Sequence, residues 1–359
     1  MNGQHHIQDR FCASILGGAL GDALGYAVEF MGMEEIFTRY GVEGIQELDV
    51  HASNGKAFIS DDTQMTLFTV DGLLRGAWLE QNRRATVDYP QEGLYPAYIR
   101  WLHTQGKPLP DQAMREWISR QPYETSGSIM DQAALFARRA PGNTCITALE
   151  SMNRGTAAKP LNNSKGCGGV MRVAPIGLFF HQDPEKAFHV GAASALLTHG
   201  HPSGYLAAGA LAAMIAELLN GAELVEGYQT AGELLKKERH HEETLEALVN
   251  AAALAQSNER PEEAIPLIGE GWVAEEALAI GLYCAMKRRS FRPALLLAVN
   301  HRGDSDSTGS ICGNLLGAYG GMEVIPNEWI LQVEMKDTIL SMADRLYEAW
   351  VRRQSQGMG

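Results

Sequence analysis

The sequence predicts a single all-α domain. Apolar residues recur at spacings of three and four through most of the 359-residue chain, as they do on one face of a helix. Alternation with period two, the pattern of a half-buried strand, is confined to a short piece around residues 45–50. The composition, 45% hydrophobic and 20% charged, is typical of a globular chain with a large core. We therefore expect a dozen or more helices in one compact domain spanning residues 1–359, with polar tails at 1–10 and 353–359.

The predicted helices follow one another along the whole chain. Leu16, Leu20 and Leu24 mark one face of the first helix, and residues 67–78 carry the same pattern. Further helices are expected at 111–120, 128–139, 185–198, 203–219, 230–257, 274–287, 292–299, 309–319 and 327–352. No long stretch rich in Gly, Ser or Pro separates these helices, so the sequence predicts no flexible linker and no second domain.

Charge and composition exclude several kinds of partner and location. With 30 Lys+Arg against 43 Asp+Glu, the formal net charge is −13, which repels nucleic acid and anionic lipid. The most apolar stretch, residues 205–216, is shorter than the roughly 20 residues needed to span a bilayer and predicts a buried helix. Residues 1–10 lack the basic and apolar segments of a signal peptide. The five cysteines are odd in number and include no CxxC pair, so we expect a reducing compartment, the cytoplasm.

A first acidic cluster, Ser60-Asp61-Asp62-Thr63, stands directly before a predicted helix. Its plainest interpretation is a capped helix start. Ser60 would accept backbone N–H bonds, and the two carboxylates would lie at the positive end of the helix dipole. Because such starts are common, this cluster alone does not require a ligand.

A second acidic cluster occupies residues 301–309, also before a predicted helix. Its acidic residues are Asp304 and Asp306, and its hydroxyl residues include Ser307 and Thr308. The Asp-x-Asp start invites comparison with a calcium-binding EF-hand loop, but Leu315 stands where that loop needs a bidentate Glu. The helix that follows carries glycines spaced by four, which leave one face flat for the close approach of a neighbouring backbone.

Together the two clusters bring four carboxylates to two helix starts. If these starts meet in space, the like charges raise one another's pKa steeply, so the cluster needs cations to persist. Oxygen ligands of this kind select Mg²⁺ or Mn²⁺ rather than zinc or copper. Their number suits two ions about 3.5–4 Å apart.

Three further segments could contribute to a site. Residues 162–172 form a Gly-rich loop that could present backbone N–H groups to a phosphate, although a plain turn fits it as well. His199 stands between two apolar helices, where a histidine is more often a structural donor than a catalyst. Asp22 and Glu29, two helical turns apart, share nearly the same face and could project into a site, or could face solvent.

Taken together, these segments resemble the ADP-ribosylglycohydrolase family, of the dinitrogenase-reductase-activating glycohydrolase type. The matching pieces span residues 15–321 in the family's order: GALGDALG followed by Glu29, SDDTQMTL, SKGCGGVMRVAPIG, LLTHGHP, GWVAEEAL and GDSDSTGSICGNLLGAYGG. The paired SDDT and GDSDST motifs are the most specific of these. The family often has Asn in its S-x-G-N-G loop, and here Cys167 stands in that place, so a side-chain hydrogen bond to the ligand is in doubt.

The resemblance implies an orthogonal assembly of helices around a cleft with a dinuclear Mg²⁺ or Mn²⁺ centre. It implies six metal ligands: Ser60, Asp61, Asp62, Asp304, Asp306 and Ser307. It implies a substrate site, holding the diphosphate and ribose, made of Ser164, Gly166, Gly168, Gly169, Met171 and His199. Glu29 matches the glutamate that lies beside the metals and assists or gates the chemistry.

The implied activity is hydrolysis of the N-glycosidic bond between ADP-ribose and a protein arginine. In this hypothesis the ions hold the ribose hydroxyls, and a water of lowered pKa attacks the anomeric carbon through an oxocarbenium-like transition state. Asp61 or Asp62 would act as the base, and Glu29 would pass a proton to the leaving guanidine. The expected partner is an ADP-ribosylated protein. An alternative is an immunity or regulatory protein that blocks a cognate ADP-ribosyltransferase toxin, or a hydrolase of another ADP-ribose linkage, to serine, nucleic acid or a small molecule.

Overall fold

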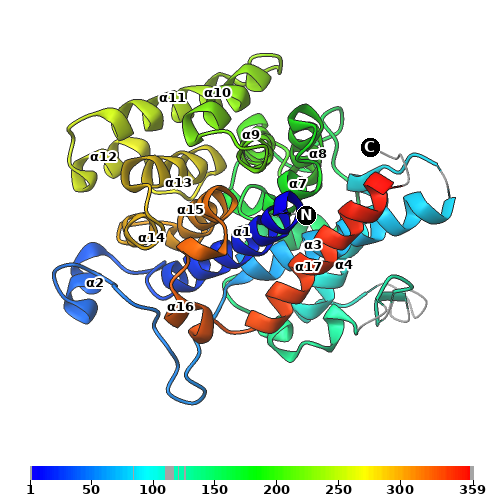
Figure 1. The fold of residues 1–359 in the computed structure, drawn as a ribbon, viewed down its shortest axis with the longest axis horizontal. Coiled ribbons are helices and arrows are strands. Elements are labelled where there is room, and N and C mark those ends of the chain that lie inside the picture. Colours follow the sequence, from blue (N-terminus) through cyan, green and yellow to red (C-terminus); the bar gives the residue numbers. More distant parts are fainter. Residues whose placement is uncertain (1, 84, 110–116, 120, 125–126, 356–359) are drawn as a thin grey trace.

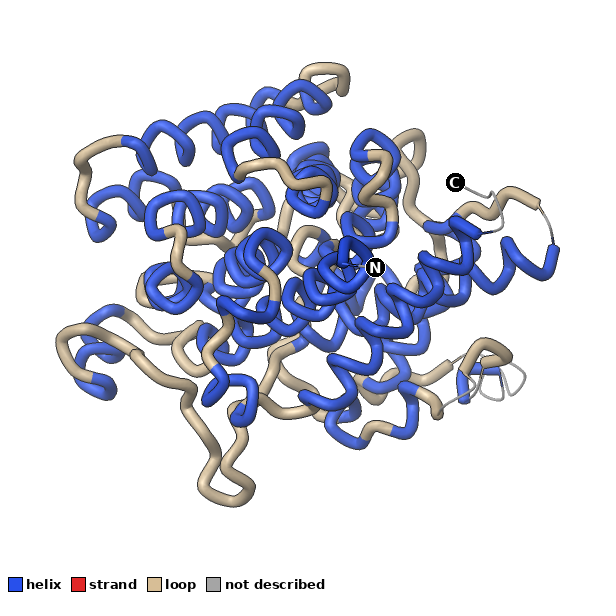
Figure 2. The backbone as a smooth tube through the Cα atoms, in the orientation of Figure 1, coloured by secondary structure: helices blue, strands red, loops and turns tan. Residues whose placement is uncertain are grey.

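The computed structural model describes residues 2–83, 85–109, 117–119, 121–124 and 127–355. Within these ranges the chain consists of helices, turns and loops, with isolated bridges and no strand, as Figures 1 and 2 show. The all-α class expected from the sequence is confirmed.

The helices run through the chain in close succession. Their bounds are α1 Asn2–Tyr26, α2 Met33–Tyr40, α3 Asp61–Arg83, α4 Tyr95–Thr104, α6 Asn143–Glu150, α7 Ala174–Phe179, α8 Pro184–Leu196, α9 Pro202–Leu219, α10 Leu224–Leu235, α11 Glu242–Gln256, α12 Pro261–Ile268, α13 Ala274–Arg288, α14 Phe291–Val299, α15 Ser305–Gly320, α16 Asn327–Gln332 and α17 Lys336–Ser355. A π-helical turn lies at Tyr89–Leu94, and 3₁₀ turns lie at Ile129–Asp131, Ala133–Phe136, Cys167–Gly169 and Met322–Val324.

The centre of the molecule is the crossing of α1 and α15, the first and one of the last helices, which lie side by side in Figure 1. The two helices run antiparallel, with their glycines facing each other. A Cβ added to Gly21 would lie 2.0 Å from the carbonyl oxygen of Gly309, and one added to Gly313 would lie 2.0 Å from that of Gly17. Because both distances are far below any van der Waals contact, only glycine permits this approach of the two backbones.

A buried pair of polar residues fixes the register of this crossing. The Asn314 amide Nδ2 donates to the carbonyl of Ser14 at 2.8 Å, and the Ser14 hydroxyl donates to the carbonyl of Asn314 at 3.0 Å. Both side chains are buried, so sliding one helix along the other would leave these donors without acceptors.

Helix α9 lies inside the bundle and packs against α7, α8, α10 and α13. Among the described helices it is the one whose length and composition would allow it to cross a membrane, and 83% of that stretch is buried inside the structure. The core helix of a soluble protein meets the same criterion, so this is weak support for a membrane span. The buried helix predicted at 205–216 is confirmed.

Three expectations from sequence periodicity are wrong. Residues 45–50 form a loop and not a strand. Residues 128–139, predicted as one helix, contain two 3₁₀ turns, because Gln132 between them has an extended backbone (φ −86°, ψ 103°) that interrupts the helix. The helix predicted at 230–257 is two helices, α10 and α11, and His240 in the turn between them has a positive φ of 59° that no helix permits.

The C-terminal pattern and the chain ends also differ from expectation. Residues 327–352 form α16 and α17, separated at Met335, which has a φ of 54°. The helix predicted from Gly309 begins at Ser305, and residues 2–10 belong to α1 instead of forming a tail. Helix α17 continues to Ser355, within the C-terminal tail predicted at 353–359. Most of the helix predicted at 111–120 lies outside the described residues.

The glycine contact predicts a large difference between two single substitutions. Gly313→Ala forces the backbones of α1 and α15 apart, and we expect it to lower the free energy of unfolding by about 3 kcal/mol or more. Gly232→Ala in α10 is the matched control, because its Cβ would meet Leu245 at an ordinary 3.5 Å. It should raise the stability by about 0.5–1 kcal/mol. Urea titrations followed by circular dichroism measure both, and equal effects would contradict the account of the crossing.

Candidate functional site

The crossing of α1 and α15 delivers three carboxylates to one place. Gly25, in the last turn of α1, lies against the first residue of α15, where an added Cβ would be 2.1 Å from the carbonyl oxygen of Ser305. Four residues later the chain reaches Glu29. Carboxylate oxygens of Glu29, Asp304 and Asp306 all lie within 4.8 Å of one another, and all three residues are buried.

Asp22 of α1 connects this crossing to the start of α3. Its buried carboxylate accepts hydrogen bonds from the backbone N–H of Ser60 at 2.9 Å and of Thr63 at 3.0 Å, and also from the Thr63 hydroxyl. These are donors that the first turn of a helix leaves without partners. Asp22 therefore holds the start of α3 against α1.

The starts of α3 and α15 are in direct contact. The Ser307 hydroxyl donates to Asp62 Oδ2 at 3.0 Å, across 245 positions of sequence. Ser60 Oγ accepts the N–H of Asp62 at 3.2 Å, so the capping interpretation of this residue also holds. Asp304 directly precedes α15, but its side chain accepts no hydrogen bond from the first turn of that helix. Its carboxylate is therefore free to contribute to the cluster.

The loop that follows residue 138 covers the remaining side of the cluster. The N–H of Gly142 donates to Asp61 Oδ2 at 3.2 Å, and the N–H of Asp61 donates to the carbonyl of Arg139 at 3.2 Å. The Arg139 guanidinium itself is bound to Glu334 and to the carbonyl of Ile59. Within the described part of the chain, no Lys or Arg side chain forms an ion pair with a carboxylate of the cluster.

Burial and mutual repulsion therefore dominate the electrostatics. Burial, followed by repulsion from Asp306, raises the pKa of Asp22 to about 7. The same two causes raise the pKa of Glu29 to about 11 and hold the pKa values of three more carboxyl groups well above their ordinary range. These three are Asp61, Asp62 and Asp304.

These residues fit a site for hard divalent cations. The donors are carboxylate and hydroxyl oxygens, which Mg²⁺ and Mn²⁺ prefer. Oxygen Oε2 of Glu29 is buried and has no hydrogen-bond partner among the described residues, so it is free to contact a bound ion or substrate. A bound cation would supply the positive charge that the protein does not provide here.

The Gly-rich loop and His199 form a second wall beside the acidic cluster. A Cβ on Gly168 would lie 3.0 Å from His199 Cε1 and 2.7 Å from Cys145 Sγ, and one on Gly169 would lie 2.7 Å from Ala195 Cβ. These two glycines are therefore required by packing. At Gly166 an added Cβ would have ordinary clearance, 3.5 Å from His199 Nε2.

His199 itself is buried and uncharged. Its Nδ1 is 2.8 Å from the Thr198 hydroxyl, which also accepts a hydrogen bond from Arg172 Nη2 at 2.8 Å. Burial, and then the nearby Arg172, lower the pKa of the imidazole to about 3. His199 can therefore offer a neutral hydrogen bond through Nε2 and is unsuited to act as a general acid near neutral pH.

Several contacts fasten the loop to its surroundings. The N–H of Ala274 donates to the carbonyl of Lys165 at 2.8 Å, and Lys165 Nζ forms ion pairs with Glu275 and, at 2.6 Å, with Glu243. Lys165 is thus committed to carboxylates. The Ser164 hydroxyl accepts the N–H of Gly166 at 3.3 Å, near the Thr144 hydroxyl at 3.1 Å.

Two loop residues touch the start of α15. Cys167 Sγ donates to Asp304 Oδ2 at 2.6 Å, so this thiol contacts the acidic cluster directly. The Ser307 hydroxyl lies 3.8 Å from Met171 Sδ. The structure thus brings the predicted metal ligands and the loop residues to one buried region.

Sequence reasoning missed three features of this region. The anchoring role of Asp22 depends on backbone donors 38 and 41 positions away. Nothing in the sequence indicated the contact between Cys167 and Asp304, apart from the unexpected cysteine at this position of the loop. Phe30 and Trp272, both partly exposed, stack at a centroid distance of 6.2 Å beside the cluster, and Trp272 lies within the GWVAEEAL segment already singled out.

Comparison with known proteins gives a consistent result. The family model described as ADP-ribosylglycohydrolase matches residues 3–356. The "ADP-ribosyl-[dinitrogen reductase] glycohydrolase" of Rhodospirillum rubrum is 25% identical over 92% of each chain. The "ADP-ribosylarginine hydrolase Tri1" of Pseudomonas putida is 23% identical over 95% of this chain and 78% of its own. A solved structure titled "ADP-ribosylglycohydrolase-related protein complex" matches with a TM-score of 0.65 at 23% identity, covering 96% of this chain and 99% of that one, which supports the fold.

The raised pKa values predict how stability depends on pH without divalent cations. The folded protein keeps protons on Glu29 and its neighbours that the unfolded chain loses above pH about 4, so folding becomes less favourable as pH rises. In EDTA the melting temperature should fall from pH 6.8 to 8.0, a window above the ordinary histidine pKa and below that of cysteine. Mn²⁺ should reverse the slope, because it binds deprotonated carboxylates.

Glu29→Gln provides the control for this measurement by differential scanning fluorimetry. The variant removes the group whose pKa is raised to about 11, so its melting temperature in EDTA should depend less on pH. A slope that is unchanged in Glu29→Gln, or insensitive to Mn²⁺ in the parent protein, would show that the cluster does not control the pH dependence.

Proposed function

This chain belongs to the ADP-ribosylglycohydrolase family, and on that basis we propose that it hydrolyses the N-glycosidic bond between ADP-ribose and an arginine side chain of a protein. The family acts on ADP-ribose linkages. The observation that carries the proposal is the contact of two acidic helix starts, through Ser307 and Asp62, around a cluster without a protein cation.

We propose that the cluster holds two Mg²⁺ or Mn²⁺ ions. The ligands would be Ser60, Asp61, Asp62, Asp304, Asp306 and Ser307. Bound ions would supply Lewis acidity and the positive charge that offsets the carboxylates. Asp22 would act as a positioning residue, because its hydrogen bonds to the N–H groups of Ser60 and Thr63 fix where α3 presents its carboxylates.

The substrate would lie between the acidic cluster and the second wall. The loop from Ser164 to Met171 would receive the diphosphate and ribose through backbone N–H groups at Gly168 and Gly169, while the N–H of Gly166 is bound to the Ser164 hydroxyl. His199, neutral and directed at this loop through Nε2, would orient the ligand without exchanging a proton. Because Lys165 is paired with Glu275 and Glu243, the positive charge for the phosphates would come mainly from the cation site.

Proton transfer would fall to the carboxylates. Asp61 or Asp62 would accept the proton of the attacking water, and Glu29 would pass a proton to the nitrogen of the departing guanidine. The negative cluster would also stabilise positive charge that develops on the ribose in an oxocarbenium-like transition state. Glu29 is suited to donate this proton because its Oε2 is buried and has no hydrogen-bond partner among the described residues.

Arginine is the proposed acceptor, since two relatives that cover most of this chain bear names consistent with it. One is called an ADP-ribosylarginine hydrolase, and the other acts, by its name, on ADP-ribosylated dinitrogen reductase. We also propose a reducing, cytoplasmic location, which the five free cysteines favour. The modified protein is proposed as the partner.

The linkage is tested by a direct comparison of substrates. Arginine-, serine- and thymidine-linked ADP-ribose are incubated with the protein in Mg²⁺, in Mn²⁺ or in EDTA, and free ADP-ribose is quantified by chromatography. We expect release from the arginine linkage with either ion and none in EDTA. Faster release from serine or thymidine would reassign the acceptor, and full activity in EDTA would remove the cation proposal.

A single substitution tests the acidic cluster itself. Asp304→Ala removes one proposed ligand, and we expect kcat to fall by at least about a thousandfold and divalent-cation affinity, measured by calorimetry, to weaken by at least tenfold. Asp337→Ala, an exposed aspartate on α17, is the control and should leave both values unchanged. Unchanged turnover by Asp304→Ala at saturating Mg²⁺ would refute the assignment.

A further inference from the structure

A groove of about 770 Å³ lies on the surface next to the acidic cluster and has no part in the chemistry described above. Its lining residues come mainly from α2, α12, the end of α14 and the segments that follow them, and these three helices lie on the same side of the molecule in Figure 1. Apolar side chains line both walls, among them Met33, Phe37 and Val42 on one side and Ile265 and Pro266 on the other. Val42 is 87% exposed, so the apolar lining faces solvent.

Each wall of this groove is connected to the candidate site, one through the chain and the other through a hydrogen bond. On one side, Met33 at the start of α2 is four residues after Glu29. On the other, the lining residue Glu270 accepts the N–H of Asp304 through its carbonyl at 2.8 Å. A substrate held at the acidic cluster with its acceptor side toward Glu29 would therefore have that side near the groove.

An aromatic pair follows, in sequence, one residue of the site and one residue of the groove lining. Phe30, directly after Glu29, is 71% exposed, and Trp272, two residues after Glu270, is 41% exposed. Their rings stack with an interplanar angle of 24°. Large exposed aromatic residues next to an apolar groove are typical of a surface that binds another molecule.

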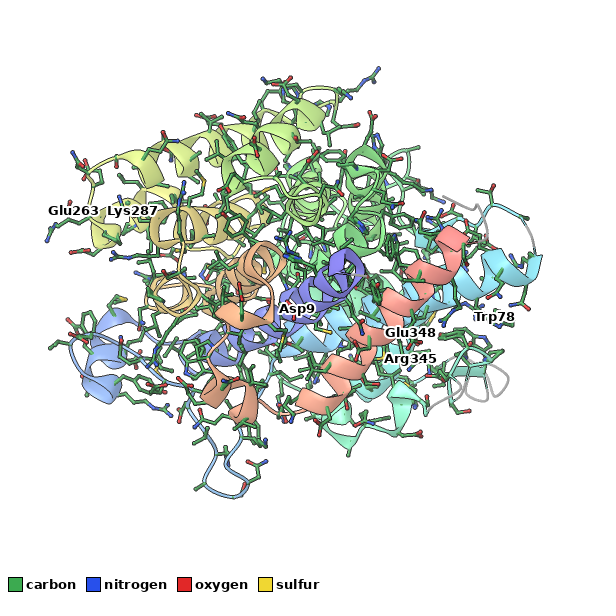
Figure 3. All side chains as sticks on the ribbon, viewed as in Figure 1. Asp9, Trp78, Glu263, Lys287, Arg345 and Glu348 are labelled. Atoms are coloured by element: carbon green, nitrogen blue, oxygen red, sulfur yellow. The ribbon has the colours of Figure 1, made fainter. Side chains whose placement is uncertain are left out.

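The charges of the groove specify the kind of molecule that fits. Its lining includes three acidic residues, Glu43, Glu262 and Glu270, and one basic residue, Arg302, which is paired with Glu270 at 3.3 Å. On α12, Glu262 and Glu263 both pair with Arg260, so the carboxylates outnumber the basic groups and the surface keeps a net negative charge; Figure 3 shows Glu263 at the outer edge of the molecule. An occupant with apolar and basic side chains complements this surface, whereas an acidic one is repelled.

We propose that this groove binds the polypeptide segment that flanks the modified residue of the substrate protein, and that it selects segments with apolar and basic side chains. The inference rests on the proposed function, because a protein-linked ADP-ribose needs a path for the acceptor chain out of the site. The groove supplies such a path from Glu29 outward. ADP-ribose would bind inside the site, and the groove would bind the side chains next to the modified residue. The groove would therefore determine which acceptor proteins are hydrolysed.

The test uses two peptides of equal length, each with one ADP-ribosylated arginine. In one peptide the flanking residues are Leu and Lys, and in the other they are Ser and Glu. Free ADP-ribosylarginine, which cannot reach the groove, is the third substrate. Steady-state kinetics with Mg²⁺ gives kcat and KM for each of the three.

The variant Val42→Lys/Glu43→Lys removes an apolar side chain and reverses a charge at the groove. Both residues are exposed, so the change should not disturb folding. Its matched control is Glu323→Lys/Val324→Lys, which makes the same pair of changes at exposed positions beyond the opposite end of α15. That helix has 16 residues and is therefore about 24 Å long.

We expect the parent protein to favour the Leu/Lys peptide over the Ser/Glu peptide by at least tenfold in kcat/KM. The groove variant should lose this preference through a higher KM, with kcat and the hydrolysis of free ADP-ribosylarginine unchanged. The control variant should behave as the parent protein does. Equal loss on free ADP-ribosylarginine, an equal effect of the control variant, or no preference in the parent protein would overturn the proposal.

Two further measurements separate this proposal from others. If no substrate is hydrolysed, the proposed function fails; fluorescence anisotropy of labelled ADP-ribosylated peptides then still reports whether the parent protein prefers the Leu/Lys peptide and the groove variant does not. If gel filtration shows a dimer that the groove variant alone abolishes, with peptide kinetics unchanged, the occupant is a second copy of the chain and the proposal is wrong.

Discussion

The contact between α1 and α15 through facing glycines is the constraint on which the site depends. Residues near the beginning and the end of the chain are brought together because Gly17, Gly21 and Gly25 allow the backbone of α15 to approach without intervening side chains. The crossing sets Glu29 beside Asp304 and Asp306, and Asp22 then ties α3 to the same place. Each carboxylate is thus located by backbone packing, with little freedom left to its side chain.

This arrangement is electrostatically unfavourable without a cation. Buried carboxylates at short range repel one another, and the loss of hydration raises the free energy of each charged group. The surrounding structure tolerates them because the close helix packing and the buried Asn314 and Ser14 hydrogen bonds hold the scaffold independently of the site. Strongly perturbed carboxylates gathered around one buried region are a property of functional sites more than of stable cores.

Much of the fold and the site could be predicted from sequence, and the exceptions have physical causes. Apolar periodicity located most helices, and two acidic helix starts with distinctive motifs located the candidate site. Periodicity missed the break between α10 and α11, because apolar residues continue on both sides of it and the left-handed conformation of the exposed His240 leaves no mark in the apolar pattern. The role of Asp22 was equally hidden, since it depends on backbone donors of a distant helix start.

The structure divides into parts that differ in how freely their sequence can vary. In α1 and α15 the backbone itself is the packing surface, so an added methyl group at Gly21 or Gly313 has no space. The rim formed by Trp272 and the outer face of α2 carries exposed side chains such as Phe37, whereas Ile36 of α2 and Gly271 are buried. Protein engineers seeking a different client for the same chemistry would therefore diversify the rim in a library and keep the two glycine-faced helices constant.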